Sequence, residues 1–285
     1  MQNVNELKKR YVDGTVKTEA GNEISLEELN FKKCIIGSDE AGKGEIFRPM
    51  ITVAAYVRPE HMDKLIELGV KDSKAYGKDY EVAEKILYHI GGTLTGFASY
   101  KDFEGKEGKV IRTDYVTFVA SALLNHRFNK DFQPGSGKKS GNLQDLLRRE
   151  HKTALLTLAK DASYDYMVVD DFQDGWHHDR ILKEIDIPAG QAVIATKADT
   201  QVMAVACASV IAYYLTNLYV DALDQMLESE YGISIPLDRS ANYKTEAFQA
   251  PLRKLDGISK EKYEAFLDKY AKKHYMRNME LYKQH

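Results

Sequence analysis

Residues 35–45 read IIGSDEAGKGE, a short apolar run that leads into two adjacent carboxylates and then into a glycine-rich loop. An apolar run of this kind is typical of a β-strand, which places Asp39 and Glu40 at the end of that strand. Neighbouring strand residues normally point to opposite faces of a sheet. Both carboxylates can therefore approach one cation only if the backbone twists or bulges there. The simpler interpretation is an acidic turn that ends a strand.

The loop after these carboxylates is suited to a phosphate. Gly42 and Gly44 allow a ligand to come close to the backbone, and Lys43 between them supplies a positive charge. A later segment, LGVKDSK, offers the hydroxyl of Ser73 and the ammonium of Lys74, which are groups that contact phosphates. Its simpler interpretation is an exposed turn.

Carboxylates also follow two other apolar segments. Asp170 ends the run YMVVD, with Asp171 beside it, and the residues alone do not decide between the two. Asp199 follows the run AVIATKA and precedes a stretch of small residues, where its alternative role is to cap a helix.

Taken together, four carboxylates at three element ends predict a site for a hard cation. Mg²⁺ prefers oxygen ligands, and without a cation the cluster is costly because like charges raise one another's pKa. A pair of such ions about 4 Å apart would activate a water and stabilise the leaving oxygen of a phosphodiester.

Length and composition are those of an ordinary globular protein. The chain has 285 residues, of which 44% are hydrophobic and 29% are charged, so it has room for one large domain or two smaller ones. These values exclude wholesale disorder, a collagen-like repeat and a small disulfide-stapled fold. No run reaches the ~18 apolar residues of a membrane helix, and no secretory signal is recognisable. Cys34 and Cys207 lie in apolar runs, so we expect buried thiols and a cytoplasmic protein.

Charge is unevenly distributed along the chain. A net charge of −3 argues against a general polyanion-binding surface but allows a local one. Residues 252–285 carry nine Lys or Arg and five Asp or Glu. Such a run is usually the solvated face of a helix.

The apolar pattern predicts an α/β fold with a mixed central sheet. Short apolar runs predict strands at 34–37, 50–57, 93–100, 166–169 and 192–195. Apolar residues three and four apart, or a high content of small residues, predict helices at 114–124, 143–160, 200–215, 219–230 and 259–283. The polar first ~30 residues predict a small appendage, and the Gly-, Ser- and Lys-rich segment 128–142 predicts a mobile loop.

Four motifs, in order along the chain, are similar to those of a known family. They are GSDEAGKGE, FRPM with the apolar run after it, LGVKDSK, and TKADTQVMAVACASVIA. Over about residues 34–285 the sequence resembles the type 2 ribonucleases H. Its GKG motif, the segment NLQDLLRREHKTAL and the C-terminal YAKKHYMRNMEL resemble bacterial ribonuclease HIII more than ribonuclease HII.

This resemblance implies a ribonuclease H-like fold, with a five-stranded mixed sheet flanked by helices and a C-terminal helical extension. It implies endonucleolytic cleavage of the RNA strand of RNA–DNA hybrids with Mg²⁺ or Mn²⁺, leaving 5′-phosphate and 3′-hydroxyl ends. Hybrids differ from DNA duplexes in the RNA 2′-hydroxyl, which both donates and accepts hydrogen bonds. Motif positions imply that the catalytic metal ligands are Asp39, Glu40, Asp170 and Asp199. They imply that the substrate contacts are Gly42, Lys43, Gly44, Ser73 and Lys74.

The chain departs from the family pattern in several places. Arg48 stands where the family has glycine, and Tyr213 stands where it usually has arginine. The N-terminal substrate-binding domain usual in ribonuclease HIII is not expected in the first 30 residues, and the basic C-terminal segment is a hypothetical substitute. We expect an appendage at 1–32, a catalytic domain at 33–217 and a C-terminal helical segment at 218–285, in a monomer without a membrane partner.

Two other functions stay open at this point. One is a hybrid-binding protein that keeps the fold without catalysis, although four clustered carboxylates give a mere binder of phosphates no advantage. The other is a metal phosphohydrolase of small phosphate esters, although the GKG and DSK motifs suit an extended backbone better.

Overall fold

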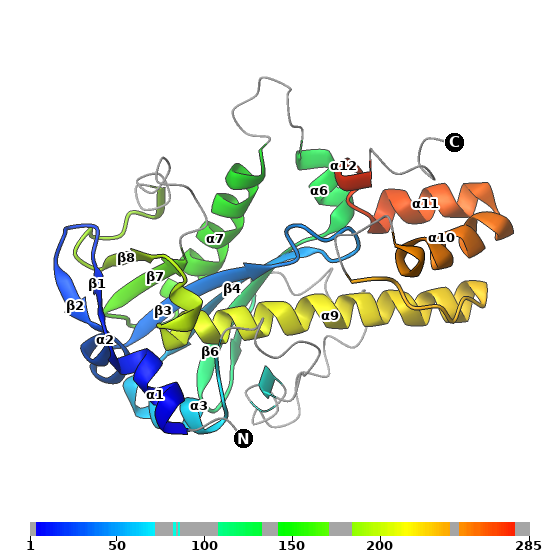
Figure 1. Ribbon diagram of the computed structural model, residues 1–285. Coiled ribbons are helices and arrows are strands. Elements are labelled where there is room, and N and C mark those ends of the chain that lie inside the picture. The colour runs from blue at the N-terminus through cyan, green and yellow to red at the C-terminus, as the bar shows by residue number, and fades with distance from the viewer. Residues whose placement is uncertain are drawn as a thin grey trace.

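The computed structural model describes residues 4–71, 82, 83, 85, 108–132, 142–170, 184–239 and 245–276. Within these ranges a six-stranded mixed sheet forms the centre of the molecule, in the order β5-β6-β4-β3-β7-β8 (Figure 1). Its strands are β3 (Ile35–Ala41), β4 (Met50–Val57), β5 (Val110–Arg112), β6 (Val116–Leu123), β7 (Tyr166–Asp170) and β8 (Ala192–Ala195). β3 pairs antiparallel with β4 and parallel with β7. The predicted mixed α/β fold is confirmed, with one strand more than the five expected.

Two strands differ from the sequence prediction. β6 occupies residues predicted as a helix at 114–124, and that prediction was wrong. Nearly every residue of VTFVASAL is apolar or small, so spacings of three and four occur there without helical order. Pairing with β4 on one side and β5 on the other makes it a strand that is buried along most of its length. β5 was not predicted, and the predicted strand at 93–100 lies outside the described residues.

Two helices cover opposite faces of this sheet. They are α7 (Leu143–Ala159) and α9 (Met203–Tyr231). Successive residues of β3 alternate between them, because Ile35 packs in the cluster that contains α9 and Ile36 packs in the cluster that contains α7. α9 comes very close to β3 at Gly37, where a Cβ atom would lie 2.5 Å from the backbone nitrogen of Val205. The absence of a side chain at Gly37 therefore sets how closely this helix approaches the strand.

α9 is long and apolar, and it runs through a predicted boundary. Its length and composition would allow it to cross a membrane, but 89% of its most apolar window is buried inside the protein. Packing against the sheet accounts for that apolarity. The helix joins the two predicted helices at 200–215 and 219–230 without a break. It thus crosses residue 217, where the expected catalytic domain ends, and the division into domains stays a prediction.

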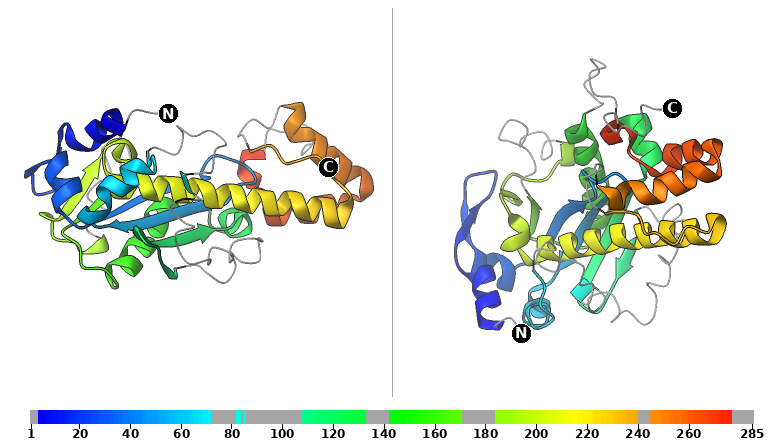
Figure 2. Two further views of the ribbon diagram at one scale, coloured as in Figure 1. Left: turned by 90° about the horizontal axis from the view of Figure 1, so that it is seen from below. Right: turned by 45° about the vertical axis from the view of Figure 1, so that its right-hand side comes forward.

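The N-terminal residues pack on the β8 edge of the sheet (Figure 2). They form α1 (Val4–Val12), β1 (Thr15–Lys17), β2 (Glu23–Ser25) and α2 (Leu26–Lys32). Thr18 bridges Val193 of β8, and Leu7, Tyr11 and Leu29 belong to the main core. The predicted appendage is therefore an integral part of the packed structure. A 3₁₀-helix at Pro59–His61 and α3 (Met62–Glu67) follow β4.

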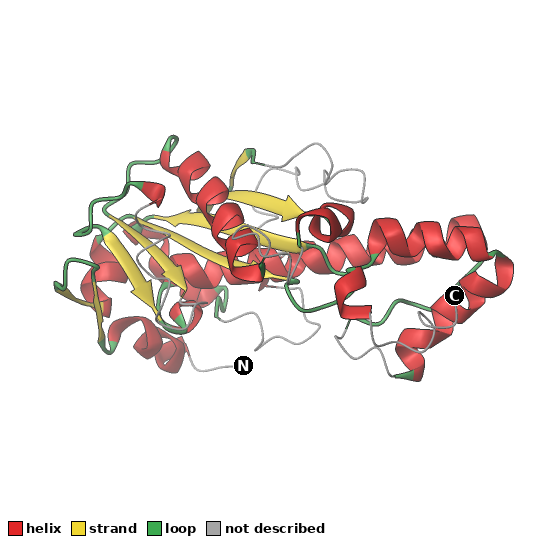
Figure 3. Cartoon of the chain, turned by 90° about the horizontal axis from the view of Figure 1, so that it is seen from above, coloured by secondary structure: helices red, strands yellow, loops and turns green. Residues whose placement is uncertain are grey.

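Helices from the C-terminal part of the chain extend beyond the end of the sheet (Figure 3). They are α10 (Glu246–Ile258), α11 (Lys260–Tyr270) and α12 (Lys273–Met276), and α11 also contacts α6 (Asn125–Asp131). These helices confirm the C-terminal helical extension, although α10 was not predicted. α6 takes up the start of the segment predicted as a mobile loop, because Phe128 is fully buried there. Both cysteines are free thiols, Cys207 buried and Cys34 half-buried.

Candidate active site

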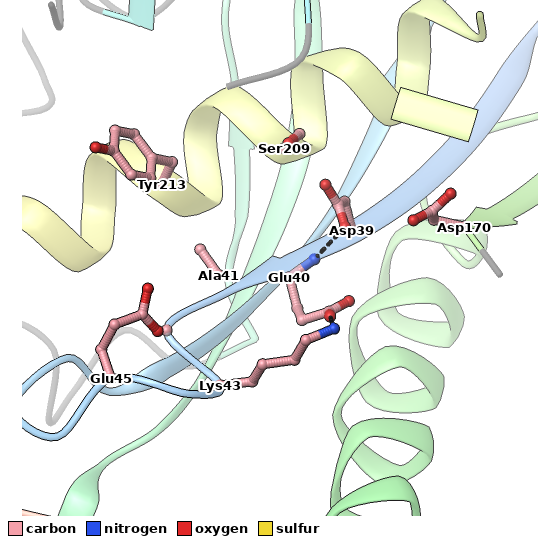
Figure 4. A pocket seen from close by; sticks show the side chains of 9 residues that line it. Asp39, Glu40, Ala41, Lys43, Glu45, Asp170, Ser209 and Tyr213 are labelled. Carbon is pink, nitrogen blue, oxygen red and sulfur yellow. Dashed lines mark hydrogen bonds and ion pairs between the residues drawn. The ribbon is translucent and has the colours of Figure 1, made fainter. Parts of the chain in front are cut away.

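A pocket at the C-terminal end of β3 gathers three of the four predicted carboxylates (Figure 4). Asp39 and Glu40 come from β3, and Asp170 ends the neighbouring parallel strand β7. The carboxyl ends of parallel strands lie at one edge of a sheet, which is where α/β proteins commonly bind ligands. The pocket has a volume of about 200 Å³, and α9 supplies Ser209 and Tyr213 to its wall.

Asp39 and Glu40 point to opposite faces of the sheet. β3 stays in regular register with β4 as far as Ala41, so there is no bulge at the two carboxylates. Asp39 lies on the α9 side, where it hydrogen-bonds with Ser209. Glu40 lies on the α7 side, where its Oε2 is 3.1 Å from Nε2 of His151. The two carboxylates therefore flank the pocket from two sides of one strand end.

Glu40 is held by two cationic or polar partners. Nζ of Lys43 lies 2.7 Å from its Oε1, and Nε2 of His151 approaches the other oxygen. Figure 4 marks the contact with Lys43 by a dashed line. Nδ1 of the same histidine lies 2.9 Å from the hydroxyl of Ser38. Burial opposes ionisation of Glu40, but the hydrogen bonds and charges of His151 and Lys43 lower its pKa below the usual value. Glu40 is therefore an ionised carboxylate at neutral pH.

Asp39 has the opposite electrostatics. It is only 8% exposed, and its Oδ1 accepts a 2.8 Å hydrogen bond from the backbone N–H of Glu40. Burial raises its pKa well above the usual range, and the charges of Glu40 and Asp170 raise it further. Burial lowers the pKa of Lys43, but the surrounding carboxylates, Glu40 foremost, outweigh burial and raise it. The pocket thus holds more negative charge than its own cation balances.

Asp170 is fixed by a backbone hydrogen bond, and the fourth predicted ligand, Asp199, lies outside the pocket lining. Oδ1 of Asp170 accepts a 2.6 Å hydrogen bond from the backbone N–H of Ala198. Asp199, the next residue, is buried in the 3₁₀-helix Ala198–Thr200 and does not line the pocket. It does not cap α9 either, because the N-cap of that helix is Val202. Asp171, Ser73 and Lys74 lie outside the described residues.

Among the described residues, no three His, Cys, Asp or Glu side chains are arranged so that together they could hold one metal ion. The alternation of Asp39 and Glu40 across the strand, together with the engagement of Glu40 by Lys43 and His151, accounts for this. β3 has no bulge that would bring the two side chains to one side. A shared ion thus requires Glu40 to rotate away from its present partners.

The two glycines of the loop have different surroundings. Gly42 has φ +81°, and a Cβ atom there would lie 1.9 Å from the carbonyl oxygen of Pro49. Glycine at this position is therefore required by the fold itself. A Cβ atom at Gly44 would meet nothing within 4 Å. The backbone N–H of Gly44 donates to Oε2 of Glu45 at 3.2 Å.

Arg48 and Tyr213, two departures from the family pattern, contact each other. The guanidinium carbon of Arg48 lies 5.1 Å from the centre of the Tyr213 ring, which is a cation–π distance. The same guanidinium donates to the side-chain amide oxygen of Asn217 at 2.7 Å and to the carboxylate of Glu45 at 3.2 Å. The guanidinium of Arg48 is thus held between the Tyr213 ring, Asn217 and Glu45.

Sequence reasoning missed His151, Ser38 and Ser209 as parts of the site. His151 lies three, four and seven residues before buried apolar residues of α7, so helical spacing places it on the face that meets the sheet. That periodicity was visible in the sequence, but nothing in it pointed to Glu40 as the partner. Ser209 lies in the small-residue stretch of α9 and carries no such signal.

A family model described as Ribonuclease HII matches residues 36–263. This covers most of the chain, and the protein belongs to the ribonuclease HII family. Ribonuclease HIII from Staphylococcus aureus (strain MW2) is 28% identical over 245 residues, which are 84% of this chain and 65% of that protein. The chain therefore spans about two thirds of the length of this relative. The resemblance to type 2 ribonucleases H found in the sequence is confirmed.

Two solved structures share the fold. Bst-RNase HIII in complex with Mn²⁺ aligns with a TM-score of 0.61 and 24% identity, over 87% of this chain and 68% of that one. RNase H3 from Aquifex aeolicus aligns with a TM-score of 0.54 and 16% identity, over 93% of this chain and 89% of that one.

Proposed function

We propose that the protein is a divalent-metal-dependent endoribonuclease that cleaves the RNA strand of RNA–DNA hybrids and leaves 5′-phosphate and 3′-hydroxyl ends. One observation carries the proposal: Asp39, Glu40 and Asp170 line one pocket beside Lys43, in a chain that matches the Ribonuclease HII family over most of its length.

The donor set of the pocket suits Mg²⁺ or Mn²⁺. Its candidate ligands are carboxylate oxygens, which hard divalent cations prefer, and a ribonuclease HIII with this fold has been solved with Mn²⁺. Burial raises the pKa of Asp39 most, the charges of Glu40 and Asp170 raise it further, and a bound cation would balance this negative charge. Asp39, Glu40 and Asp170 would hold the metal. Asp199 follows Ala198, whose backbone N–H donates to Asp170. When bound, the divalent ions would supply the activation of water and the stabilisation of the leaving oxygen.

The chain's own groups prepare the site for a phosphodiester. Ser209 orients Asp39 from α9, while His151 keeps Glu40 ionised and therefore able to act as a ligand. Lys43 supplies a positive charge for a phosphate at the pocket, and Gly44 beside it has open space where a side chain would stand. We propose substrate contacts for Gly42, Lys43 and Gly44, and we keep those of Ser73 and Lys74 as predictions from the sequence.

The test offers three labelled substrates to the full-length protein, each with Mg²⁺ and with Mn²⁺. They are a long RNA–DNA hybrid, a DNA duplex with one embedded ribonucleotide, and a plain DNA duplex. We expect cleavage of the hybrid and none of plain DNA, and no cleavage by Asp39→Asn. Asp63→Asn is the matched control, because Asp63 is an exposed carboxylate that pairs with Lys8. Absence of hybrid cleavage with either ion, or wild-type cleavage by Asp39→Asn, would contradict the proposal.

A second candidate function is binding of hybrids without catalysis. It is favoured by one observation, that Glu40 is engaged by Lys43 and His151 and that no three described ligands converge. Hybrid binding that is tight, independent of divalent ions and never followed by cleavage would support this alternative.

A further inference from the structure

Lys272 is a fully buried lysine whose ammonium points at the loop next to the pocket. Residues 42–48 are called the substrate loop here. Nζ of Lys272 donates to the backbone carbonyl oxygens of Gly42, of Glu45 at 2.8 Å and of Arg48 at 2.5 Å. An ammonium group has three N–H donors, and all three are used. A cation from the C-terminal part of the chain therefore draws together three carbonyl groups of this loop.

Other groups from the same side bind the carbonyl oxygens between these points. The backbone N–H of Lys272 donates to the carbonyl oxygen of Ile46 at 2.9 Å. The side-chain amide of Asn125 donates to the carbonyl oxygens of Ile46 at 3.3 Å and Phe47 at 3.0 Å. The ring of Phe128 lies 5.4 Å from the Lys272 ammonium. Every carbonyl from residue 45 to residue 48 is thus bound from this side.

The orientation of these carbonyls determines what the loop presents to the pocket. In a trans peptide the C=O and the following N–H point in opposite directions. Since the carbonyl of Gly42 points to Lys272, the backbone N–H of Lys43 points away from it. Gly42 and Lys43 line the pocket, whereas Lys272 does not. Lys272 therefore holds the loop from the side opposite to the N–H of Lys43, a residue that lines the pocket.

The carbonyl groups of the loop account for a lysine at this buried position. Lysine is rarely fully buried unless it is paired with a carboxylate. Among the described residues, no carboxylate forms a salt bridge with the ammonium of Lys272. Burial lowers its pKa to about 7, while the charge of Glu45 favours the charged form. An apolar residue would fill the space without this cost, but it would leave three carbonyls without donors.

We propose that Lys272 is a positioning residue that presets the substrate loop for the sugar–phosphate backbone of the hybrid. The inference rests on the proposed function for the nature of the ligand. It also assigns one of the nine basic residues of the C-terminal segment to the loop itself, and not to direct contact with nucleic acid.

The experiment measures hybrid affinity without divalent ions, so that cleavage does not enter. Wild type, Lys272→Met and the control Lys254→Met, which removes an exposed lysine of α10, are titrated with one labelled hybrid. We expect about tenfold weaker binding for Lys272→Met, since small misplacements of binding groups have large effects. The control is expected to stay within about twofold. Far-UV circular dichroism and thermal melting establish that each variant is folded.

Two further measurements separate positioning from a loss of packing. n-Propylammonium, which has the three carbons and the ammonium that Lys272→Ala removes, is expected to restore hybrid affinity in that variant. Tetramethylammonium, which has no N–H donor, is expected to have no effect. If Lys272→Met does not fold, Lys272→Gln takes its place. Its amide has only two donors for the three carbonyls, so weaker binding than wild type is still expected. Wild-type affinity in whichever of these two variants folds would overturn the proposal. Because no cleavage is required, hybrid affinity that depends on Lys272 would stand even if the protein proved not to be a nuclease.

Discussion

Neutralising Asp39 is expected to stabilise the metal-free protein while it abolishes cleavage. Asp39 is buried, and burial together with the charges of Glu40 and Asp170 raises its pKa well above the usual range. Asparagine has nearly the same shape, and its amide oxygen still accepts from the backbone N–H of Glu40. Asp39→Asn therefore removes an unfavourable buried charge and keeps that hydrogen bond.

The size of the effect follows from the like charges that surround the carboxylate. Two unit charges about 5 Å apart repel by roughly 3 kcal/mol at an effective dielectric constant of 20, and Lys43 offsets part of this. We expect Asp39→Asn to raise the free energy of unfolding by about 1–3 kcal/mol at pH 7 without metal. The folded-state pKa is raised, so the folded protein binds this proton more tightly than the unfolded chain does. Wild-type stability therefore falls as pH rises through the window above the ordinary aspartate pKa, and the two proteins converge at low pH.

Chemical denaturation measures the free energy of unfolding that tests this prediction, in EDTA at low and neutral pH and again with Mg²⁺. An ion at ten times its dissociation constant stabilises a folded protein by about 1.4 kcal/mol. We expect that increment for wild type and for the exposed control Asp63→Asn, and none for Asp39→Asn. If Asp39→Asn were less stable than wild type in EDTA at pH 7, or if Mg²⁺ stabilised it as much as wild type, the electrostatic account of the pocket would be refuted.

Three more predictions follow from packing and burial. Gly37→Ala must push Val205 and α9 off the sheet, so it is expected to lower the free energy of unfolding by about 3 kcal/mol in urea denaturation. Gly42→Ala is expected to lower the melting temperature, whereas Gly44→Ala is expected to leave it unchanged and to weaken hybrid binding. A lower melting temperature for Gly44→Ala together with an unchanged one for Gly42→Ala would contradict this assignment. Burial lowers the pKa of Lys272 to about 7, so the unfolded chain binds more protons above that pH. Between pH 7 and 9 wild type should gain roughly 2 kcal/mol in stability relative to Lys272→Met, and parallel pH dependences of the two proteins would contradict this.

Patterns within one element predicted most of the sheet and part of the site. Four of the strands are short apolar runs bounded by glycine or charged residues, and such runs are a local signal. The meeting of Asp39 with Asp170 also follows from a general rule, because both end parallel strands that turn out to be neighbours. The same local reasoning failed at 114–124, where a uniformly apolar segment carries no period that separates a helix from a strand.

The contacts that tune the site join residues that are far apart in the chain. His151 and Glu40 are separated by 111 positions, and Lys272 and Gly42 by 230. A single sequence contains no signal that links such pairs, since periodicity identifies the buried face of an element but not what it meets. Arg48 and Tyr213 illustrate the same limit. Each stood out alone as a departure, and nothing in the sequence indicated that the two side chains would contact each other.

The arrangement of the C-terminal segment changes how its contribution to hybrid binding should be tested. Deleting residues 252–285 would remove exposed basic residues, but it would also remove Lys272 and buried core residues such as Leu255 and Phe266. A loss of affinity after deletion would therefore not separate surface charge from the state of the substrate loop. Changing the exposed Lys254 and Lys260 to Gln removes charge and leaves the packing in place. If affinity keeps its wild-type value in that double variant and falls in Lys272→Met, Lys272 acts through the substrate loop and not as surface charge, because of these three lysines it is the one that bonds the loop.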